Sequence, residues 1–131
     1  MFAITGITGN VGGEMARALL AGGKSVRAVV RDAHKGKAWA EQGCEVAVAD
    51  IGDAATLTEA FRAADGVFLL VPPIFDPSPD FAEARAIAAT LRSALETARP
   101  AKVIYLSTIG AQANQTNLTP SYVVEQVGRF N

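Results

Sequence analysis

The sequence contains very few of the side chains that cross-link small proteins or hold metal ions. Among its 131 residues there is one cysteine, Cys44, and one histidine, His34. An internal disulfide needs two cysteines, and structural zinc sites use clusters of Cys and His ligands. The composition therefore excludes a disulfide framework and predicts no metal site. Cys44 and the single tryptophan, Trp39, are expected to be packing residues.

The sequence also lacks a long hydrophobic run and an excess of charge of one sign. No apolar run approaches the about 20 residues of a membrane-spanning helix, and the amino terminus lacks the basic start of a signal peptide. We therefore expect a cytoplasmic protein without membrane contacts. Twelve basic and thirteen acidic residues are scattered along the chain, so no basic face for nucleic acid is expected.

Hydrophobic residues make up 50% of the chain and gather in five short runs rich in Val, Ile, Leu and Phe. These runs are apolar at successive positions, which is typical of strands buried on both faces of a sheet. The expected strands are residues 2–5, 25–30, 45–49, 66–71 and 102–107. Segments with helical spacing of apolar residues lie between them. The expected helices are residues 11–19, 33–42, 57–64 and 81–95, with Asp32 and Asp53 as N-caps of the second and third.

Strict alternation of strands and helices with short connections predicts parallel pairing through right-handed crossovers. We therefore expect an α/β fold, a doubly wound parallel sheet of the Rossmann type with about five strands in the order 3-2-1-4-5. Residues 1–112 are expected to form this single domain. Residues 113–131 are expected to add a C-terminal loop or short helix rather than a second domain.

Three glycines, Gly6, Gly9 and Gly12, lie where the first strand leads into the first helix. A helix N-terminus presents unpaired N–H groups and the positive end of the helix dipole, so this position suits a phosphate. Gly6 would permit the sharp turn, Gly9 a close approach of the backbone to a pyrophosphate, and Gly12 close packing of the helix. Thr8 and Asn10 add side-chain donors. The alternative is a tight turn without a ligand.

The end of the second strand, "VVRDAHKGK", carries positive charge. Arg31 with Lys35 and Lys37 suits an adenosine 2′-phosphate, which predicts NADP(H) rather than NAD(H) as the ligand. A solvated surface charge is the alternative for Arg31. Asp32 could accept from a ribose hydroxyl, but its position favours the N-cap.

The ends of the third and fourth strands supply further candidates. Asp50 could accept from the adenine amino group, and Ile51 could pack on the adenine ring. Val71 and Pro72 lie at the level of the nicotinamide ribose in such a fold. Each has an alternative, with Asp50 as a turn residue and Pro72 as a strand terminator.

The segments "ITGITGNVGG", "VRAVVRD", "ADIGD" and "VIYLSTIGA" resemble the NmrA-like branch of the atypical short-chain dehydrogenases over residues 1 to about 112. The resemblance implies that Ser107 lies near the substrate in catalytic relatives. It also implies pyrophosphate binding by Gly6, Thr8, Gly9, Asn10, Val11 and Gly12, 2′-phosphate binding by Arg31 and Lys35, and nicotinamide contacts from Val71, Pro72 and Pro73.

Dehydrogenases of the wider superfamily use a tyrosine and a lysine four residues later as the proton donor. Tyr122 is followed four residues later by Gln126, which cannot lower the pKa of the phenol. A shifted register places Asn117 and Ser121 at these positions, so neither register gives the pair. Ser107 and Tyr122 remain the catalytic candidates.

Three functions remain open. The chain is an NAD(P)H-dependent oxidoreductase with a quinone-type acceptor, a non-catalytic NADP(H)-sensing protein, or a truncated nucleotide-binding fragment without activity. Relatives continue with further strands and a substrate region after the segment that matches this chain. Because the strand at 102–107 then lies at a sheet edge, we expect a homo-oligomer.

Overall fold

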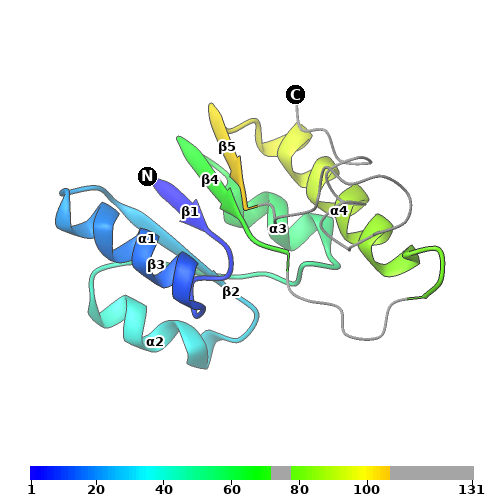
Figure 1. Ribbon diagram of the computed structural model, residues 1–131. Helices are drawn as coiled ribbons and strands as arrows, with labels where there is room; N and C mark the ends of the chain where they lie inside the picture. Colours follow the sequence, from blue (N-terminus) through cyan, green and yellow to red (C-terminus); the bar gives the residue numbers. More distant parts are fainter. Residues whose placement is uncertain (72–77, 107–131) are drawn as a thin grey trace.

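The computed structural model describes residues 1–71 and 78–106 and contains the alternating elements that the sequence predicts (Figure 1). The predicted boundary at residue 112 lies outside the described residues. The strands are β1 (Phe2–Ile4), β2 (Val26–Val30), β3 (Glu45–Val48), β4 (Gly66–Leu69) and β5 (Lys102–Tyr105). The helices are α1 (Asn10–Ala21), α2 (Ala33–Glu41), α3 (Ala54–Phe61) and α4 (Ala82–Ala98).

The five strands form one parallel sheet in the order β3-β2-β1-β4-β5, which confirms the predicted topology. Phe2 of β1 is in register with Val26 of β2 on one side and with Gly66 of β4 on the other. The chain leaves β1 toward β2 and β3, and then crosses back to β4. The connections that follow β1 and β4 therefore lead to opposite sides of the sheet at the point where the strand order reverses, which is where ligands bind in such sheets.

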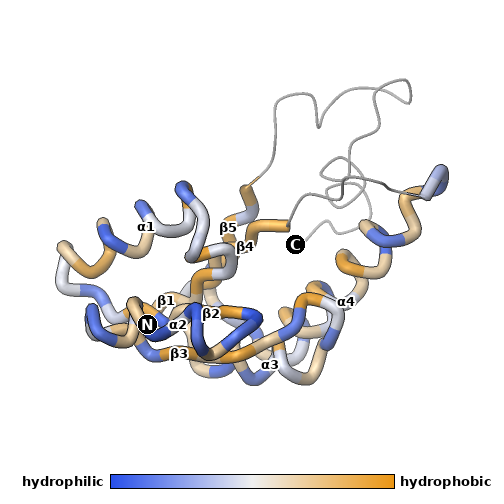
Figure 2. Tube along the Cα trace, turned by 90° about the horizontal axis from the view of Figure 1, so that it is seen from below, coloured by the Kyte–Doolittle hydropathy of each residue, from blue (hydrophilic) through white to orange (hydrophobic). Residues whose placement is uncertain are grey.

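Hydrophobic residues follow the strands (Figure 2) and build a core on each face of the sheet. Neighbouring residues of a strand point to opposite faces, so Ala3 and Val67 pack toward α3 and α4, whereas Ile4 and Phe68 pack toward α1 and α2. Phe61 of α3 is fully buried in the first of these cores. Burial on both faces explains why the strands read as continuous apolar runs.

Two predicted N-caps agree with local hydrogen bonds, although α3 spans Ala54–Phe61 rather than the predicted residues 57–64. The Asp32 carboxylate accepts from the His34 N–H at 2.9 Å, and the Asp53 carboxylate accepts from the Ala55 N–H at 2.9 Å. Both aspartates are therefore N-caps, which confirms the prediction. Gly22 is the C-cap of α1.

Arg27 of β2 ties three elements together on the side away from the carboxyl ends of the strands. Its guanidinium donates to the Glu45 carboxylate of β3 at 2.9 Å. It also donates to the carbonyl oxygens of Ala60 and Arg62 at 2.9 and 2.7 Å. A cation at the C-terminus of a helix satisfies carbonyls that have no partner within the helix. Arg27 therefore fixes the end of α3 against β2 and β3.

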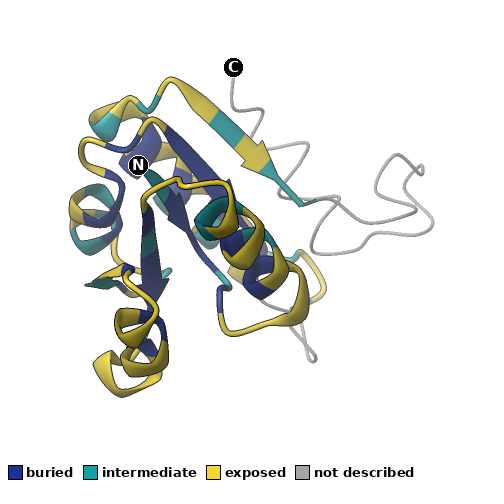
Figure 3. Ribbon diagram, turned by 90° about the vertical axis from the view of Figure 1, so that its left-hand side faces the viewer, coloured by how far each residue is buried: buried dark blue, intermediate teal, exposed yellow. Residues whose placement is uncertain are grey.

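The edge strand β5 is more exposed than its neighbour β4. β4 is buried throughout, whereas β5 alternates between exposed and half-buried residues (Figure 3). Ile104 of β5 is 57% exposed. Among the described residues, no helix has both the length and the apolarity needed to cross a membrane.

Candidate functional site

The turn between β1 and α1 has a geometry that depends on two of its three glycines. Gly6 has a φ of +63°, and a Cβ there would lie 2.5 Å from Cδ2 of Leu70. A Cβ on Gly12 would overlap the carbonyl oxygen of Gly6 and lie 2.8 Å from its carbonyl carbon. The Gly9 N–H donates to that same carbonyl at 3.0 Å. The roles expected for Gly6 in the turn and Gly12 in close packing therefore agree with the structure.

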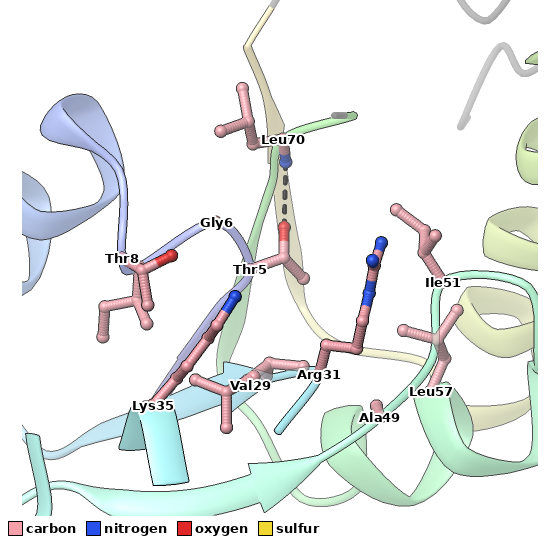
Figure 4. Close-up of a pocket in the computed structure, with 12 residues that line it drawn as sticks. Thr5, Gly6, Thr8, Val29, Arg31, Lys35, Ala49, Ile51, Leu57 and Leu70 are labelled. Atoms are coloured by element: carbon pink, nitrogen blue, oxygen red, sulfur yellow. Dashed lines mark hydrogen bonds between the residues drawn. The ribbon is translucent and has the colours of Figure 1, made fainter. Parts of the chain in front are cut away.

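Thr5, the residue after β1, holds the end of β4 in place. Its hydroxyl donates to the carbonyl of Phe68 at 3.1 Å and accepts from the N–H of Leu70 at 2.9 Å (Figure 4). Its own N–H donates to the Phe68 carbonyl at 3.0 Å. Thr5 is only 6% exposed, so its hydroxyl is largely shielded from water. The carboxyl ends of β1 and β4 are thereby fixed relative to each other.

A cavity of about 300 Å³ opens at the carboxyl ends of the strands beside this turn. Figure 4 shows Lys35 on one side of it, Ile51 and Leu57 on the other, and Arg31 between them. Among the described residues, those that line the cavity come mainly from the β3-β2-β1 half of the sheet, and Leu70 alone comes from the β4 side. The lining residues are Thr5, Gly6, Ile7, Thr8, Val29, Val30, Arg31, Lys35, Ala49, Ile51, Leu57 and Leu70.

The charge of this cavity is positive. The side chains of Arg31 and Lys35 line it, and no Asp or Glu is among the described lining residues. In residues 1–71 and 78–106, neither cationic group has an ion pair or a side-chain hydrogen bond. By contrast, every other described arginine donates a side-chain hydrogen bond: Arg17, Arg27, Arg62, Arg85, Arg92 and Arg99. Arg31 and Lys35 are therefore available to an anionic ligand.

The two aspartates considered as ligand contacts are engaged elsewhere. Asp32 caps α2. The Asp50 carboxylate accepts from the Gly52 N–H at 2.8 Å and closes a turn, and Asp50 is not among the cavity-lining residues. Its neighbour Ile51 does line the cavity, so the segment after β3 contributes an apolar wall there.

The remaining pyrophosphate candidates lie on the α1 side of the turn. Gly9 and Asn10, with Thr8, line a neighbouring cavity of about 470 Å³ that reaches Trp39. Gly9 is the N-cap of α1 and offers no side chain to cap it. The first N–H groups of α1 therefore face this region without a side-chain cap. Val11 is 48% exposed and lies at the same helix end.

The other candidates are placed away from the cavity or outside the described residues. Val71 packs against Ala84 and Ala88 of α4. The predicted positions of Pro72, Pro73, Ser107 and Tyr122 lie outside the described residues. Cys44 is buried, and burial raises the pKa of its thiol. Among the described residues no group of three or more His, Cys, Asp and Glu side chains could hold a metal ion.

Sequence reasoning missed much of the lining. Thr5, Val29, Ala49 and Leu70 were not singled out, although each lies at or just after the carboxyl end of a strand. That position is a usable signal, because these ends converge on the ligand crevice. Leu57 comes from the first turns of α3 and carries no such signal.

The glycine turn after β1, the reversal of strand order beside it and the cationic end of β2 define a dinucleotide-binding domain of the doubly wound class. The chain belongs to the NAD(P)H-binding family, whose sequence pattern matches residues 6–130. A nicotinamide dinucleotide also fits the residues present. Gly6 and Gly12 form a turn that side chains would fill, and Arg31 and Lys35 offer unpaired positive charge.

Several relatives are reductases by name. The chain is 32% identical over 111 residues to the NAD(P)H azoreductase of Xenophilus azovorans, covering 85% of this chain and 36% of the azoreductase. The NADPH-dependent quinone oxidoreductase of Escherichia coli in complex with NADPH has a TM-score of 0.78 at 27% identity, covering 96% of this chain and 44% of that one. The triphenylmethane reductase of Citrobacter sp. shares the fold, with a TM-score of 0.84 at 24% identity, covering 98% of this chain and 44% of that one. The chain thus spans less than half of each.

The contact between Gly12 and Gly6 leads to a testable prediction. Gly12→Ala places a methyl group on the Gly6 carbonyl, and such overpacking typically costs about 1–3 kcal/mol of stability. The same shift displaces the N-terminus of α1, so NADPH binding should weaken. Urea unfolding and calorimetric titration measure the two effects.

Gly22→Ala is the matched control at the other end of α1. Its Cβ would lie 3.5 Å from the carbonyl oxygens of Ala18 and Leu19, which is ordinary contact, and its φ is −81°. Stability should change by less than about 0.5 kcal/mol. Equal losses in the two variants would contradict the role given to Gly12.

Proposed function

We propose that this chain is the NADP(H)-binding part of an NAD(P)H-dependent reductase that acts on a quinone-type acceptor, in the NmrA-like branch. The observation that carries the proposal is that Arg31 and Lys35 line a cavity in which no described side chain forms an ion pair with them and no described carboxylate lines the wall. An NAD-selective site of this fold places an acidic residue near the end of the second strand for the ribose hydroxyls. Here Asp32 occupies that region but caps α2.

The names of the relatives support the acceptor class. One is an azoreductase and another a quinone oxidoreductase. When bound, the cofactor supplies a hydride. The residues of this chain bind and orient it, with the α1 N-terminus and the glycine turn at the pyrophosphate and Arg31 with Lys35 at the 2′-phosphate. Ile51 and Leu57 form an apolar wall for the adenine.

Selectivity for NADPH over NADH tests the cofactor assignment. Each charge-assisted hydrogen bond to the 2′-phosphate contributes on the order of 1.5–3 kcal/mol, so a preference of about tenfold or more is expected. Arg31→Ala should remove most of it. Arg92→Ala is the control, because Arg92 pairs with Glu96 on α4 away from the cavity. Equal calorimetric affinities for NADPH and NADH would refute the assignment of Arg31.

Turnover tests the reductase assignment. We expect NADPH oxidation with a panel of quinones and no carbonyl reduction, because Tyr122 has no lysine four residues later. Tyr122→Phe should leave quinone reduction unchanged. Binding without any quinone turnover would instead support the NADP(H)-sensing alternative, and loss of quinone reduction in Tyr122→Phe would make Tyr122 the proton donor.

We further propose that the chain forms a homo-oligomer through β5. Among the described strands β5 pairs only with β4, and its exposed Ile104 lies beside an apolar groove of about 190 Å³ lined by Phe2, Met15, Leu19 and Phe68 among others. Exposed edge strands recruit further strands. Light scattering should show a dimer or larger species, and Ile104→Lys should shift it toward monomer. A wild-type monomer with rapidly exchanging β5 amides would refute the proposal.

A further inference from the structure

A contact between a cation and an aromatic ring joins the two helices that flank the proposed ligand site. The guanidinium carbon of Arg17 in α1 lies 5.5 Å from the centre of the Trp39 ring in α2. An arginine within about 6 Å of a tryptophan ring centre is attracted to the face of the ring. Both residues line the cavity of about 470 Å³, and neither is among the described residues that line the cavity of about 300 Å³. The contact therefore lies behind the proposed ligand site rather than in it.

Further contacts on α1 fix the position of the Arg17 guanidinium. It donates to the Glu14 carboxylate at 2.6 Å. A Cβ on Gly13, one turn earlier in the helix, would lie 3.5 Å from the Nη1 atom of Arg17. The guanidinium therefore lies against the N-terminal half of α1, the helix that begins at the glycine turn.

On α2, Trp39 shares a helix face with the cavity lysine. Lys35 and Trp39 are four residues apart, which places them on the same side of a helix. Trp39 is 6% exposed and packs in the same core as Ile7 of the glycine turn. α2 otherwise packs mainly on β2 and β3, where Gly36 allows it to lie close to Val46. Trp39 therefore supplies a direct link from α2 to α1.

A dinucleotide with a 2′-phosphate has two anionic parts that meet these two helices. In the function proposed above, the pyrophosphate lies at the N-terminus of α1, and the 2′-phosphate lies at Arg31 and Lys35 beside the start of α2. NADH has the pyrophosphate but carries a hydroxyl group in place of the 2′-phosphate. The distance between the start of α1 and the start of α2 therefore affects the binding of NADPH more than the binding of NADH.

We propose, resting on the function proposed above, that Arg17 is a positioning residue for the preference for NADPH over NADH. Its contact with Trp39 holds α2 at the distance from α1 at which Lys35 meets the 2′-phosphate while the pyrophosphate lies on α1. Arg17 acts through the ring of Trp39 and not through its own charge.

Calorimetric titration of the full chain with NADPH and NADH tests the proposal. A contact between a cation and an aromatic ring at a partly exposed site contributes enough free energy for about a two- to fivefold change in affinity. Arg17→Ala should therefore weaken NADPH binding by about two- to fivefold and leave NADH binding unchanged. Arg92→Ala is the matched control, because Arg92 also pairs with a glutamate of its own helix, on α4. It should leave both affinities unchanged.

A second pair of variants separates the contact with the ring from the charge of Arg17. Trp39→Leu removes the ring and keeps an apolar side chain in the core. In this background Arg17→Ala should cause no further loss of the preference for NADPH, because two residues that act through one contact are not additive. The Arg17→Ala comparison in the native chain decides the proposal by itself should Trp39→Leu fail to fold.

The outcomes separate this proposal from the function on which it rests. If the native chain prefers NADPH by about tenfold or more and Arg17→Ala leaves that preference intact, or weakens both nucleotides equally, Arg17 has no positioning role and the NADP(H) assignment stands. An undiminished effect of Arg17→Ala in the Trp39→Leu background would also overturn the proposal. If the native chain binds NADH as tightly as NADPH, the assignment of Arg31 and Lys35 is wrong, and the positioning role is wrong with it.

Discussion

The close approach of α1 to the Gly6 carbonyl is the constraint on which the rest of the binding end depends. It exists because position 12 has no Cβ, and it places the N-terminus of α1 directly beside the end of β1. Thr5, one residue before Gly6, fixes that same end to β4 through two hydrogen bonds of its hydroxyl. One short segment thus sets the position of the first helix and of the two central strands.

The order of the strands could be predicted because it follows from two patterns that are visible along the sequence. Continuous apolar runs mark strands buried on both faces, and strict alternation with helices leaves parallel crossovers as the connection. The same locality explains the success with Asp32 and Asp53, whose side chains bond to N–H groups two residues away. Gly36 lies inside α2, although glycine is unfavourable in a helix interior. In the structure Gly36 allows α2 to pack closely against β3, since a Cβ there would lie 2.5 Å from Cγ1 of Val46.

The binding site could be predicted only where the backbone determines it. The spacing of Gly6 and Gly12 predicts a turn between strand and helix. The position of Arg31 at the end of a strand predicts that it lies near the ligand. Leu57 and Thr5 could not be found in this way. Leu57 lines the cavity from α3, which packs on the sheet, and the hydroxyl of Thr5 bonds to residues more than sixty positions away. Contacts of that kind depend on the assembled sheet rather than on the local pattern.

The position of Arg27 bears on how the ligand preference of the site could change during evolution. It anchors the C-terminal end of α3 to β2 and β3, while Asp53 caps the N-terminal end beside the cavity. Arg27 thus holds α3, which carries Leu57 of the apolar wall, from a residue that does not line the cavity. Ligand preference and backbone architecture are therefore separable in this chain. An exposed position such as Arg31 can exchange one nucleotide preference for another while the scaffold around it stays the same.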